Sequence, residues 1–387
     1  MRSLKKTKNM AIPLVRSQTV SFVYLLLLYC LSFASHHVVI VVMDGARYSE
    51  TMGDTSNVPN IAALARQGTA LTNFRTFLPC PAHRLISETI PGHSRITTGT
   101  HQDLSNDGSM LPTSPSIFQY YRKEKRTDSS SCIVLCSKKK LDILANTSDP
   151  FWSGKYLPTV DCGSYGIRDD SITHALAIEY ILRERPSLML INYAGPDEMG
   201  HSGDWNGYIE KIKKTDDFIG EIWRAIQNDP ILRNSTTLFI TNDHGRHTHD
   251  FYSHGDDCEG CTHIMFIAIG PGIKINHSSA IPRELIDIAP TIGYIANFSI
   301  PGAEGKVMHE IFRNAPIVID DIIKSPVFDK RVVFNNLPSG TLVECFSLSG
   351  KRSRPEHIVE QEGSSDLNRI SVKNRATGIY LYRIRNR

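Results

Sequence analysis

The chain has 387 residues, of which 41% are hydrophobic and 21% are charged, and its formal net charge is +3. This length and composition are ordinary for a globular protein with a large core. The nearly balanced charge excludes a generally basic surface for nucleic acid, so the expected partner is a small molecule.

The first 35 residues are typical of a targeting segment. Basic residues precede an apolar run from Val20 to Phe33, and the small residues Ala34 and Ser35 follow it. At roughly 15 apolar residues the run is short for a bilayer span, which needs about 20. We therefore expect a signal peptide at 1–35, with an uncleaved anchor as the alternative. The expected location is secreted, periplasmic or at the cell surface, with no membrane contact beyond this segment.

Strand and helix patterns then alternate along the chain. The β-branched run 37–43 is typical of a strand buried on both faces of a parallel sheet. Later patterns predict helices at 58–66, 116–123, 172–183 and 205–227, and strands at 71–77, 133–135, 188–193, 237–241 and 263–269. This order predicts an α/β domain at 36–316, with a doubly wound, mostly parallel sheet flanked by helices. Ligands of such a sheet bind outside the carboxyl ends of its strands.

Three aspartates and three histidines follow the ends of these predicted strands. They are Asp44, Asp197, His201, Asp243, His244 and His254. Carboxylates and imidazoles gathered at one edge are suited to two divalent ions of the zinc type. Two such ions, about 4 Å apart, clamp the attacking and leaving oxygens of an in-line displacement. The alternatives are a helix cap or turn for Asp44 and a surface pair for Asp197 and His201.

A further motif joins these residues to a known family. Thr89, Pro91, His93, Thr98 and Gly99 satisfy the pattern Thr-x-Pro-x-His-x-x-x-x-Thr-Gly. With the strand-end motifs, the chain from Val38 to Met308 resembles the alkaline phosphatase superfamily, particularly its nucleotide pyrophosphatase/phosphodiesterase-like members.

The resemblance implies a role for each candidate residue. Asp44, Asp243 and His244 would hold the ion that activates Thr89, which would itself complete that site. Asp197, His201 and His254 would hold the other ion. His247, His249 and His263 are close enough in sequence to replace a histidine in this assignment.

The nucleophile is either Thr89 or Cys80. In the sulfatase pattern the nucleophile lies nine positions before a Thr-Gly pair, and Thr89 has this spacing whereas Cys80 does not. A threonine cannot become the formylglycine of sulfatases. The resemblance thus implies a secreted two-metal hydrolase of phosphoric monoesters or diesters with a zinc-activated threonine. The alternatives are a sulfatase-like or phosphoethanolamine-transferase-like member of the superfamily, or a non-catalytic relative.

Lys138 and Lys140, just after the 133–135 strand, are candidate substrate-binding residues. The segment is similar to one by which some phosphomonoesterases and phosphonate hydrolases of the superfamily grip phosphate oxygens. Cationic donors there favour monoesters, which carry more charge than diesters. The alternative is a solvated basic turn.

Two further features concern the cysteines and the C-terminus. Cys132 with Cys136, and Cys258 with Cys261, are close pairs. A Cys-x-x-Cys such as Cys258 and Cys261 can bind metal or do redox work, but without a second such pair it is a weak signal for zinc, so we expect a small disulfide that pins a loop. Alternating runs in 317–387 predict a small β module. The stretches 346–352 and 376–381 resemble the C-terminal sorting domain of type IX secretion, whose machinery would then be a partner.

Overall fold

The computed structural model describes residues 36–78 and 86–313, together with the backbone of six strands beyond residue 330. The chain forms two compact units, the second beginning at Asn314, and each is described by itself. The predicted signal segment and Cys80 lie outside the described residues.

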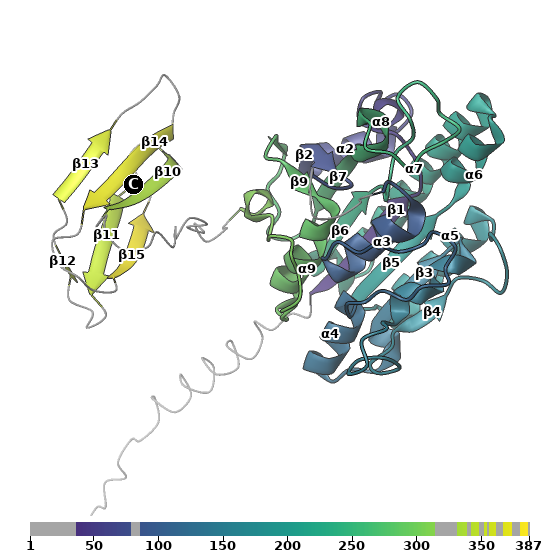
Figure 1. The fold of residues 1–387 in the computed structure, drawn as a ribbon, viewed down its shortest axis with the longest axis horizontal. Helices are drawn as coiled ribbons and strands as arrows, with labels where there is room; N and C mark the ends of the chain where they lie inside the picture. Colours follow the sequence, from purple (N-terminus) through teal and green to yellow (C-terminus); the bar gives the residue numbers. More distant parts are fainter. Residues whose placement is uncertain are drawn as a thin grey trace, which may run out of the picture. The chain divides into compact units, whose positions relative to one another are not determined.

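A nine-stranded sheet forms the centre of the first unit (Figure 1). Its strand order is β4-β3-β5-β1-β6-β7-β2-β8, and β9 pairs with β2. The strands are β1 (His37–Met43), β2 (Thr69–Arg75), β3 (Cys132–Cys136), β4 (Thr159–Asp161), β5 (Leu188–Tyr193), β6 (Thr236–Thr241), β7 (His263–Ile269), β8 (His277–Ser279) and β9 (Arg283–Glu284). The run from β4 to β6 is parallel, and β7 is antiparallel to both β6 and β2. The predicted fold, a mostly parallel sheet flanked by helices, is confirmed.

Helices cover both faces of this sheet. They are α2 (Pro59–Gln67), α3 (Thr89–Thr98), α4 (Ile117–Lys125), α5 (Asp170–Glu184), α6 (Gly195–Ser202), α7 (Trp205–Asn228), α8 (Glu259–Thr262) and α9 (Ile288–Ala296). Apolar side chains of α2, α5 and α7 form one core with Val39, Val41 and Met43 of β1. Helices α3, α4 and α9 contact one another across the other face (Figure 1). None of the described helices has the length and apolar character that a bilayer crossing requires.

Local sequence explains where the main helices begin. Ser116 and Gln119 form a reciprocal capping box at the start of α4, and Asp204 accepts a hydrogen bond from the Gly207 backbone at the start of α7. The predicted helices and strands match the structure to within two or three residues at their ends.

The strands β3, β5, β1 and β6 are parallel neighbours, so their carboxyl ends lie at one edge of the sheet. The candidate residues follow these strand ends.

The cysteine prediction is wrong for the described residues. Cys132, Cys136, Cys258 and Cys261 are all free thiols. Cys132 and Cys136 are the first and last residues of the extended strand β3, so the strand itself holds them apart.

The second unit contains two three-stranded antiparallel sheets. Their orders are β10-β14-β13 and β12-β11-β15. The strands are β10 (Arg331–Pro338), β11 (Leu342–Ser347), β12 (Arg352–Ser353), β13 (Glu356–Glu360), β14 (Leu367–Lys373) and β15 (Tyr380–Arg385). The alternating runs thus form strands, and the resemblance to a sorting domain stays a prediction.

Candidate metal centre

The structure brings the six strand-end residues together at the carboxyl edge of the sheet. Their ligand atoms form overlapping groups in which all atoms lie within 4.8 Å of one another. The groups are Asp197 with His201 and His254, Asp44 with Asp197 and His244, and Asp44 with His93 and Asp243. The trio expected for the second ion is thus one group. The trio expected for the first ion is divided between two groups that share Asp44.

The first group is built on helix α6. Asp197 and His201 lie one helical turn apart, and His254 reaches them from the β6–β7 connection. The Nε2 atoms of His201 and His254 are 3.0 Å apart, and they lie 3.5 and 3.6 Å from Asp197 Oδ1. His254 Nδ1 donates to the Ser87 carbonyl at 2.9 Å, which leaves its Nε2 lone pair facing the group.

His244 occupies the centre of the site. Its Nε2 lies 3.6 Å from Asp44 Oδ1, 3.5 Å from Asp243 Oδ2 and 3.4 Å from the Thr89 hydroxyl. Its Nδ1 lies 2.8 Å from the Gly245 carbonyl, so Nδ1 carries the proton. Burial lowers the pKa of His244 to about 3 and that of His254 to about 4. Both imidazoles are therefore neutral near pH 7, which is the form that binds a metal ion.

Asp243 provides a test of whether a cation fits. Its Oδ1 accepts hydrogen bonds from the backbone N–H groups of Gly45 and His244 at 3.1 and 2.9 Å. Its Oδ2 is buried and receives no hydrogen bond from the described residues. The nearest nitrogen, His93 Nδ1, lies 3.2 Å from this oxygen but 2.8 Å from the Thr89 carbonyl, to which it donates. A buried carboxylate oxygen that accepts no hydrogen bond is costly, and a bound cation removes that cost. The residues present fit a divalent ion.

Lys138 reaches into the same cluster. Its ammonium donates to Asp44 Oδ1 at 2.8 Å, to Asp197 Oδ2 at 2.6 Å and to the Thr89 hydroxyl at 3.1 Å. Burial lowers the pKa of this lysine, but the charges of Asp197 and Asp44 outweigh burial and raise it. Burial in turn raises the pKa of Asp197, and the charge of Lys138 holds it well below its ordinary value. The ammonium is thus charged and held against the carboxylates.

Lys140 points elsewhere. Its Nζ donates to the backbone and side-chain oxygens of Asn106 at 2.9 and 3.0 Å. The same side-chain oxygen accepts from the Ile90 backbone at 3.0 Å, at the start of α3. Of the two predicted substrate-binding lysines, the structure brings only Lys138 to the metal-ligand candidates, and it places Lys140 behind the first turn of α3.

Thr89 is the first residue of α3 and is 1% exposed. The helix lies directly against the Asp243 segment, because a Cβ added to Gly92 would be 2.4 Å from the Asp243 carbonyl oxygen. A helix start also presents free backbone N–H groups and a partial positive charge to an anion. The Thr89 hydroxyl therefore lies between a helix N-terminus, a lysine and the metal-ligand candidates.

Three buried residues of the site were not predicted as site residues. His93 was noted only as part of a motif, and its Nδ1 lies 2.8 Å from the Thr89 carbonyl and 3.2 Å from Asp243 Oδ2. Asn192 donates to Asp44 Oδ2 at 2.8 Å. Arg246 is fully buried and pairs with Asp197 Oδ1. The sequence did offer a signal for Asn192, because a polar residue near the carboxyl end of a buried strand indicates a site residue.

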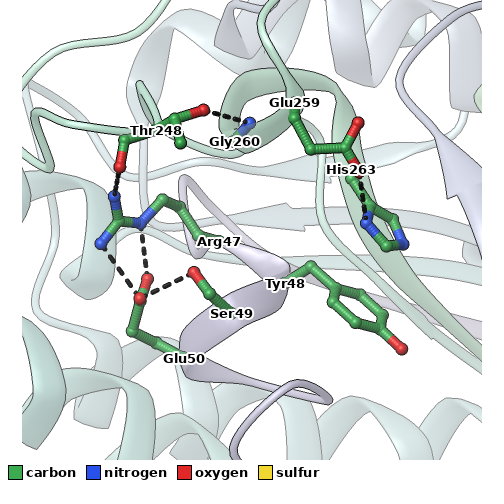
Figure 2. Close-up of a pocket in the computed structure, with 8 residues that line it drawn as sticks. All are labelled: Arg47, Tyr48, Ser49, Glu50, Thr248, Glu259, Gly260 and His263. Carbon is green, nitrogen blue, oxygen red and sulfur yellow. Dashed lines mark hydrogen bonds and ion pairs between the residues drawn. The ribbon is translucent and has the colours of Figure 1, made fainter.

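The three histidines considered as replacements lie outside this site. His247 approaches two cysteines of the same connection, and His249 is exposed. His263 stacks on Tyr48 with ring centroids 3.9 Å apart. His263 and Tyr48 line a separate pocket of about 380 Å³, shown in Figure 2.

Comparison with known proteins agrees with this geometry. Residues 167–299 match the family model "Metalloenzyme: Metalloenzyme superfamily". Among curated proteins, a 2,3-bisphosphoglycerate-independent phosphoglycerate mutase of Gracilaria tenuistipitata var. liui is 33% identical over 127 residues, which are 32% of this chain and 24% of that protein. The corresponding enzyme of an Antithamnion species is 34% identical over 135 residues, or 34% and 25% of the two chains. The chain thus spans about a quarter of the length of these relatives.

Solved structures show the same fold. A phosphonate monoester hydrolase from Silicibacter pomeroyi has a TM-score of 0.52 at 14% identity, covering 79% of this chain and 80% of its own. Human ectonucleotide pyrophosphatase/phosphodiesterase 5 has a TM-score of 0.53 at 14% identity, covering 72% of this chain and 100% of its own. Identities this low show the fold alone.

Proposed function

Since residues 167–299 match the metalloenzyme superfamily model and the first unit has the alkaline phosphatase-like fold, we propose that the protein is a two-metal hydrolase of phosphoric esters with Thr89 as its nucleophile. One observation carries the proposal. The buried Thr89 hydroxyl lies 3.4 Å from His244 Nε2 and 3.1 Å from Lys138 Nζ. The same His244 Nε2 lies 3.5 Å from Asp243 Oδ2, which accepts no hydrogen bond from the described residues.

The donor set supports zinc. Three imidazoles and three carboxylates are ligands that zinc accepts, whereas magnesium and calcium sites are built from oxygens alone. We assign Asp44, Asp243 and His244 to one ion, with Thr89, and Asp197, His201 and His254 to the other. When bound, such ions lower the pKa of a hydroxyl and neutralise phosphate charge.

The chain's own residues then account for the chemistry. The Thr89 oxygen attacks phosphorus, the bond from phosphorus to the leaving oxygen breaks, and the phosphoryl group is left on Thr89. A water molecule next attacks the same phosphorus, and the bond to Thr89 breaks to release the phosphate product. Lys138 stabilises the alkoxide form of Thr89 and the developing charge on the phosphoryl oxygens.

The surroundings bear on the substrate class. Lys138 adds a positive charge beside the phosphoryl position, which favours a monoester because its transferred group carries one more negative charge than that of a diester. A cavity of about 740 Å³ adjoins His254, and Ile86, Glu88, Asp103 and Leu104 are among its lining residues. We propose that this cavity accommodates the leaving group.

Metal analysis combined with an ester panel tests the function. The full chain, loaded with zinc or manganese, is assayed on aryl phosphate monoesters, phosphate diesters, phosphonate monoesters and sulfate esters. We expect hydrolysis of phosphoric esters that requires about two ions at the candidate metal centre of each chain. Sulfate turnover above phosphate turnover would favour the sulfatase-like alternative. Transfer of the phosphoryl group to an added alcohol, in place of water, would favour a transferase. The absence of turnover by fully metal-loaded protein would favour a non-catalytic relative.

We also propose export of the protein, on the basis of the apolar run at 20–33 and the small residues after it. N-terminal sequencing of the protein from its source checks this. A mature chain that begins near residue 36 supports a cleaved signal. An intact N-terminus on protein recovered with the membrane fraction supports the uncleaved anchor, and an intact N-terminus on protein that stays in the cytoplasm contradicts export.

A further inference from the structure

A second group of metal-ligand side chains lies outside the candidate metal centre. It consists of His247, Asp256, Cys258 and Cys261, whose ligand atoms all lie within 4.8 Å of one another. We propose that these four side chains bind a separate, structural zinc ion that stabilises the folded β6–β7 connection. They are referred to below as the clasp.

The distances within the clasp fit tetrahedral coordination. Zinc binds thiolate sulfur at about 2.3 Å and imidazole nitrogen at about 2.0–2.1 Å, so a tetrahedral angle places the two ligand atoms about 3.6 Å apart. His247 Nδ1 lies 3.4 Å from Cys261 Sγ and 3.7 Å from Cys258 Sγ. It lies 3.0 Å from Asp256 Oδ1. The side chains already have nearly the separations that a shared ion would impose.

Hydrogen bonds at His247 Nδ1 do not account for the convergence of the other three side chains on it. His247 Nδ1 has either one proton or one lone pair, so it can make one good hydrogen bond, yet three potential partners surround it. A cation at the centre of the group satisfies all four ligands together. Two cysteines, a histidine and an aspartate form a donor set suited to zinc.

The backbone brings the two halves of the clasp together before any ion binds. The N–H groups of Gly245 and Arg246 donate to the carbonyls of Cys261 and Gly260, each at 2.9 Å. The crossing is so close that a Cβ on Gly245 would lie 2.0 Å from the Gly260 oxygen, and one on Gly260 would lie 2.4 Å from the Arg246 oxygen. Only glycine fits at either position without movement of the backbone.

Two further contacts orient the ligands. The Asp256 carboxylate accepts a hydrogen bond from the Cys258 backbone at 3.1 Å, which turns it toward the cysteines. On the other side of the connection, Arg47 donates to the carbonyls of His247 and Thr248 at 2.8 and 3.2 Å. Figure 2 shows Arg47 held between the Thr248 carbonyl and Glu50, with Gly260 beside Thr248. These hydrogen bonds from Arg47 fix the backbone of His247.

The clasp encloses a candidate ligand of the other site. His254 lies between His247 and Asp256 in sequence, and its imidazole belongs to the group of Asp197 and His201. A zinc ion in the clasp restrains the connection on both sides of His254. Its effect on catalysis is therefore to position His254, and this part of the inference rests on the proposed function.

Cobalt substitution tests the clasp directly in the full-length wild-type chain. Cobalt(II) bound by thiolate gives a sulfur-to-metal charge-transfer band in the near ultraviolet, and none of the ligands proposed for the other site is a cysteine. We expect this band in wild type, and we expect it to persist in the Asp44→Asn and His244→Ala variants. A cobalt-loaded wild-type protein without the band would overturn the inference, whether or not the protein hydrolyses esters.

Variants and thiol chemistry provide the second line of evidence. Cys258→Ala combined with Cys261→Ala should remove one zinc equivalent per chain, and His247→Ala should weaken retention of that ion. Cys132→Ala and His249→Ala are the matched controls and should keep the wild-type zinc content. Cys258 and Cys261 should resist alkylation until a chelator is added. A disulfide between them in the native protein, detected by mass spectrometry without reduction, would contradict a zinc clasp.

Discussion

Lys138 Nζ lies 2.6 Å from Asp197 Oδ2, although the two residues follow different strands and are separated by 59 positions in the sequence. The same ammonium lies 2.8 Å from Asp44 Oδ1, and the lysine side chain is only 6% exposed. A buried lysine between two buried aspartates partly balances their negative charge. This arrangement bears on both the substrate and the stability of the metal-free protein.

Thr89→Ala should abolish turnover of an aryl phosphate ester and leave metal content nearly unchanged, because the proposed ions keep six other ligands. Thr89→Ser should keep measurable turnover, since it retains a hydroxyl at the start of α3. Steady-state kinetics and metal analysis check both variants. Cys80→Ala is the control and should be mild. Activity that survives Thr89→Ala and disappears in Cys80→Ala would show that the nucleophile is assigned wrongly.

Lys138→Ala should lower kcat/KM for a phosphate monoester more than for a diester. A well-placed donor in such a site is worth about 2.7–4 kcal/mol of transition-state stabilisation, or roughly a hundredfold to a thousandfold in rate. Lys140→Ala should have a smaller effect, because its ammonium binds Asn106 behind α3. Lys139→Ala is the surface control, since its side chain is exposed and pairs with Asp142 at 2.8 Å. Equal losses for both ester types would remove the argument for monoesters.

Removal of the metal should abolish activity and lower the melting temperature without unfolding the first unit. Lys138 and Arg246 remain paired with Asp197 in the metal-free chain, so the buried carboxylates keep cationic partners. A ligand at a thousand times its Kd adds about 4.1 kcal/mol to stability. Calorimetry before and after chelation measures the change, and added zinc should restore both properties. Loss of secondary structure on chelation, seen by circular dichroism, would contradict this picture.

The metal-free chain should lose stability as the pH falls below about 6.5. In the folded chain the pKa of His244 is lowered to about 3 and that of His254 to about 4, from an ordinary value of 6.5. Between these values the unfolded chain binds protons that the folded chain does not, so the free energy of unfolding decreases with decreasing pH. Each imidazole contributes up to about 1.4 kcal/mol per pH unit. Urea titrations at several pH values measure the slope, which His254→Gln should reduce. An unchanged slope in that variant would rule out His254 as a cause.

Gly92→Ala should lower both stability and turnover. The added Cβ would meet the Asp243 carbonyl at 2.4 Å, so α3 would have to move away from a metal-ligand candidate and carry Thr89 with it. Gly220→Ala in α7 is the control, because its Cβ would meet the side chain of Asn60, which can move. Thermal melts and kcat distinguish the two variants. Equal effects would mean that the contact between α3 and Asp243 is not a tight one.

The sequence predicted the sheet and the strand-end residues because both follow from local pattern. The strands 188–193 and 263–269 match the structure at both ends, since each is an apolar run with clear limits. Parallel strands place their carboxyl ends at one edge, so polar residues after several such strands had to meet.

Loop geometry could not be predicted in the same way. Lys138 and Lys140 are two positions apart after β3, and the short 3₁₀ helix Lys139–Ala145 begins between them and turns Lys140 away. The sequence does not show in which direction each side chain of such a turn points. Arg246 lies in the β6–β7 connection, outside any helical or strand pattern of the sequence. Its ion pair with Asp197 depends on how this connection folds, so the sequence alone could not predict it.

The clasp shows another limit of pattern reading. The pair Cys258 and Cys261 was a weak zinc signal because no second Cys-x-x-Cys accompanies it in the sequence. Its further partners are Asp256, two positions before Cys258, and His247, which the backbone crossing at Gly245 and Gly260 brings back to the cysteines. The contact between His247 and the cysteines depends on how the chain folds back on itself and not on the spacing of these residues in the sequence.

The antiparallel pairing of β6 and β7 has a consequence for how such proteins diversify. A parallel connection must carry the chain back along the sheet, usually through a helix, and this requirement limits its length. The segment 242–262 leaves β6 and enters β7 at the same edge, so no return path constrains it. The length of this segment can therefore change without rethreading the sheet, even though it carries three candidate metal ligands (Asp243, His244 and His254), residues beside the proposed leaving-group cavity, and the clasp.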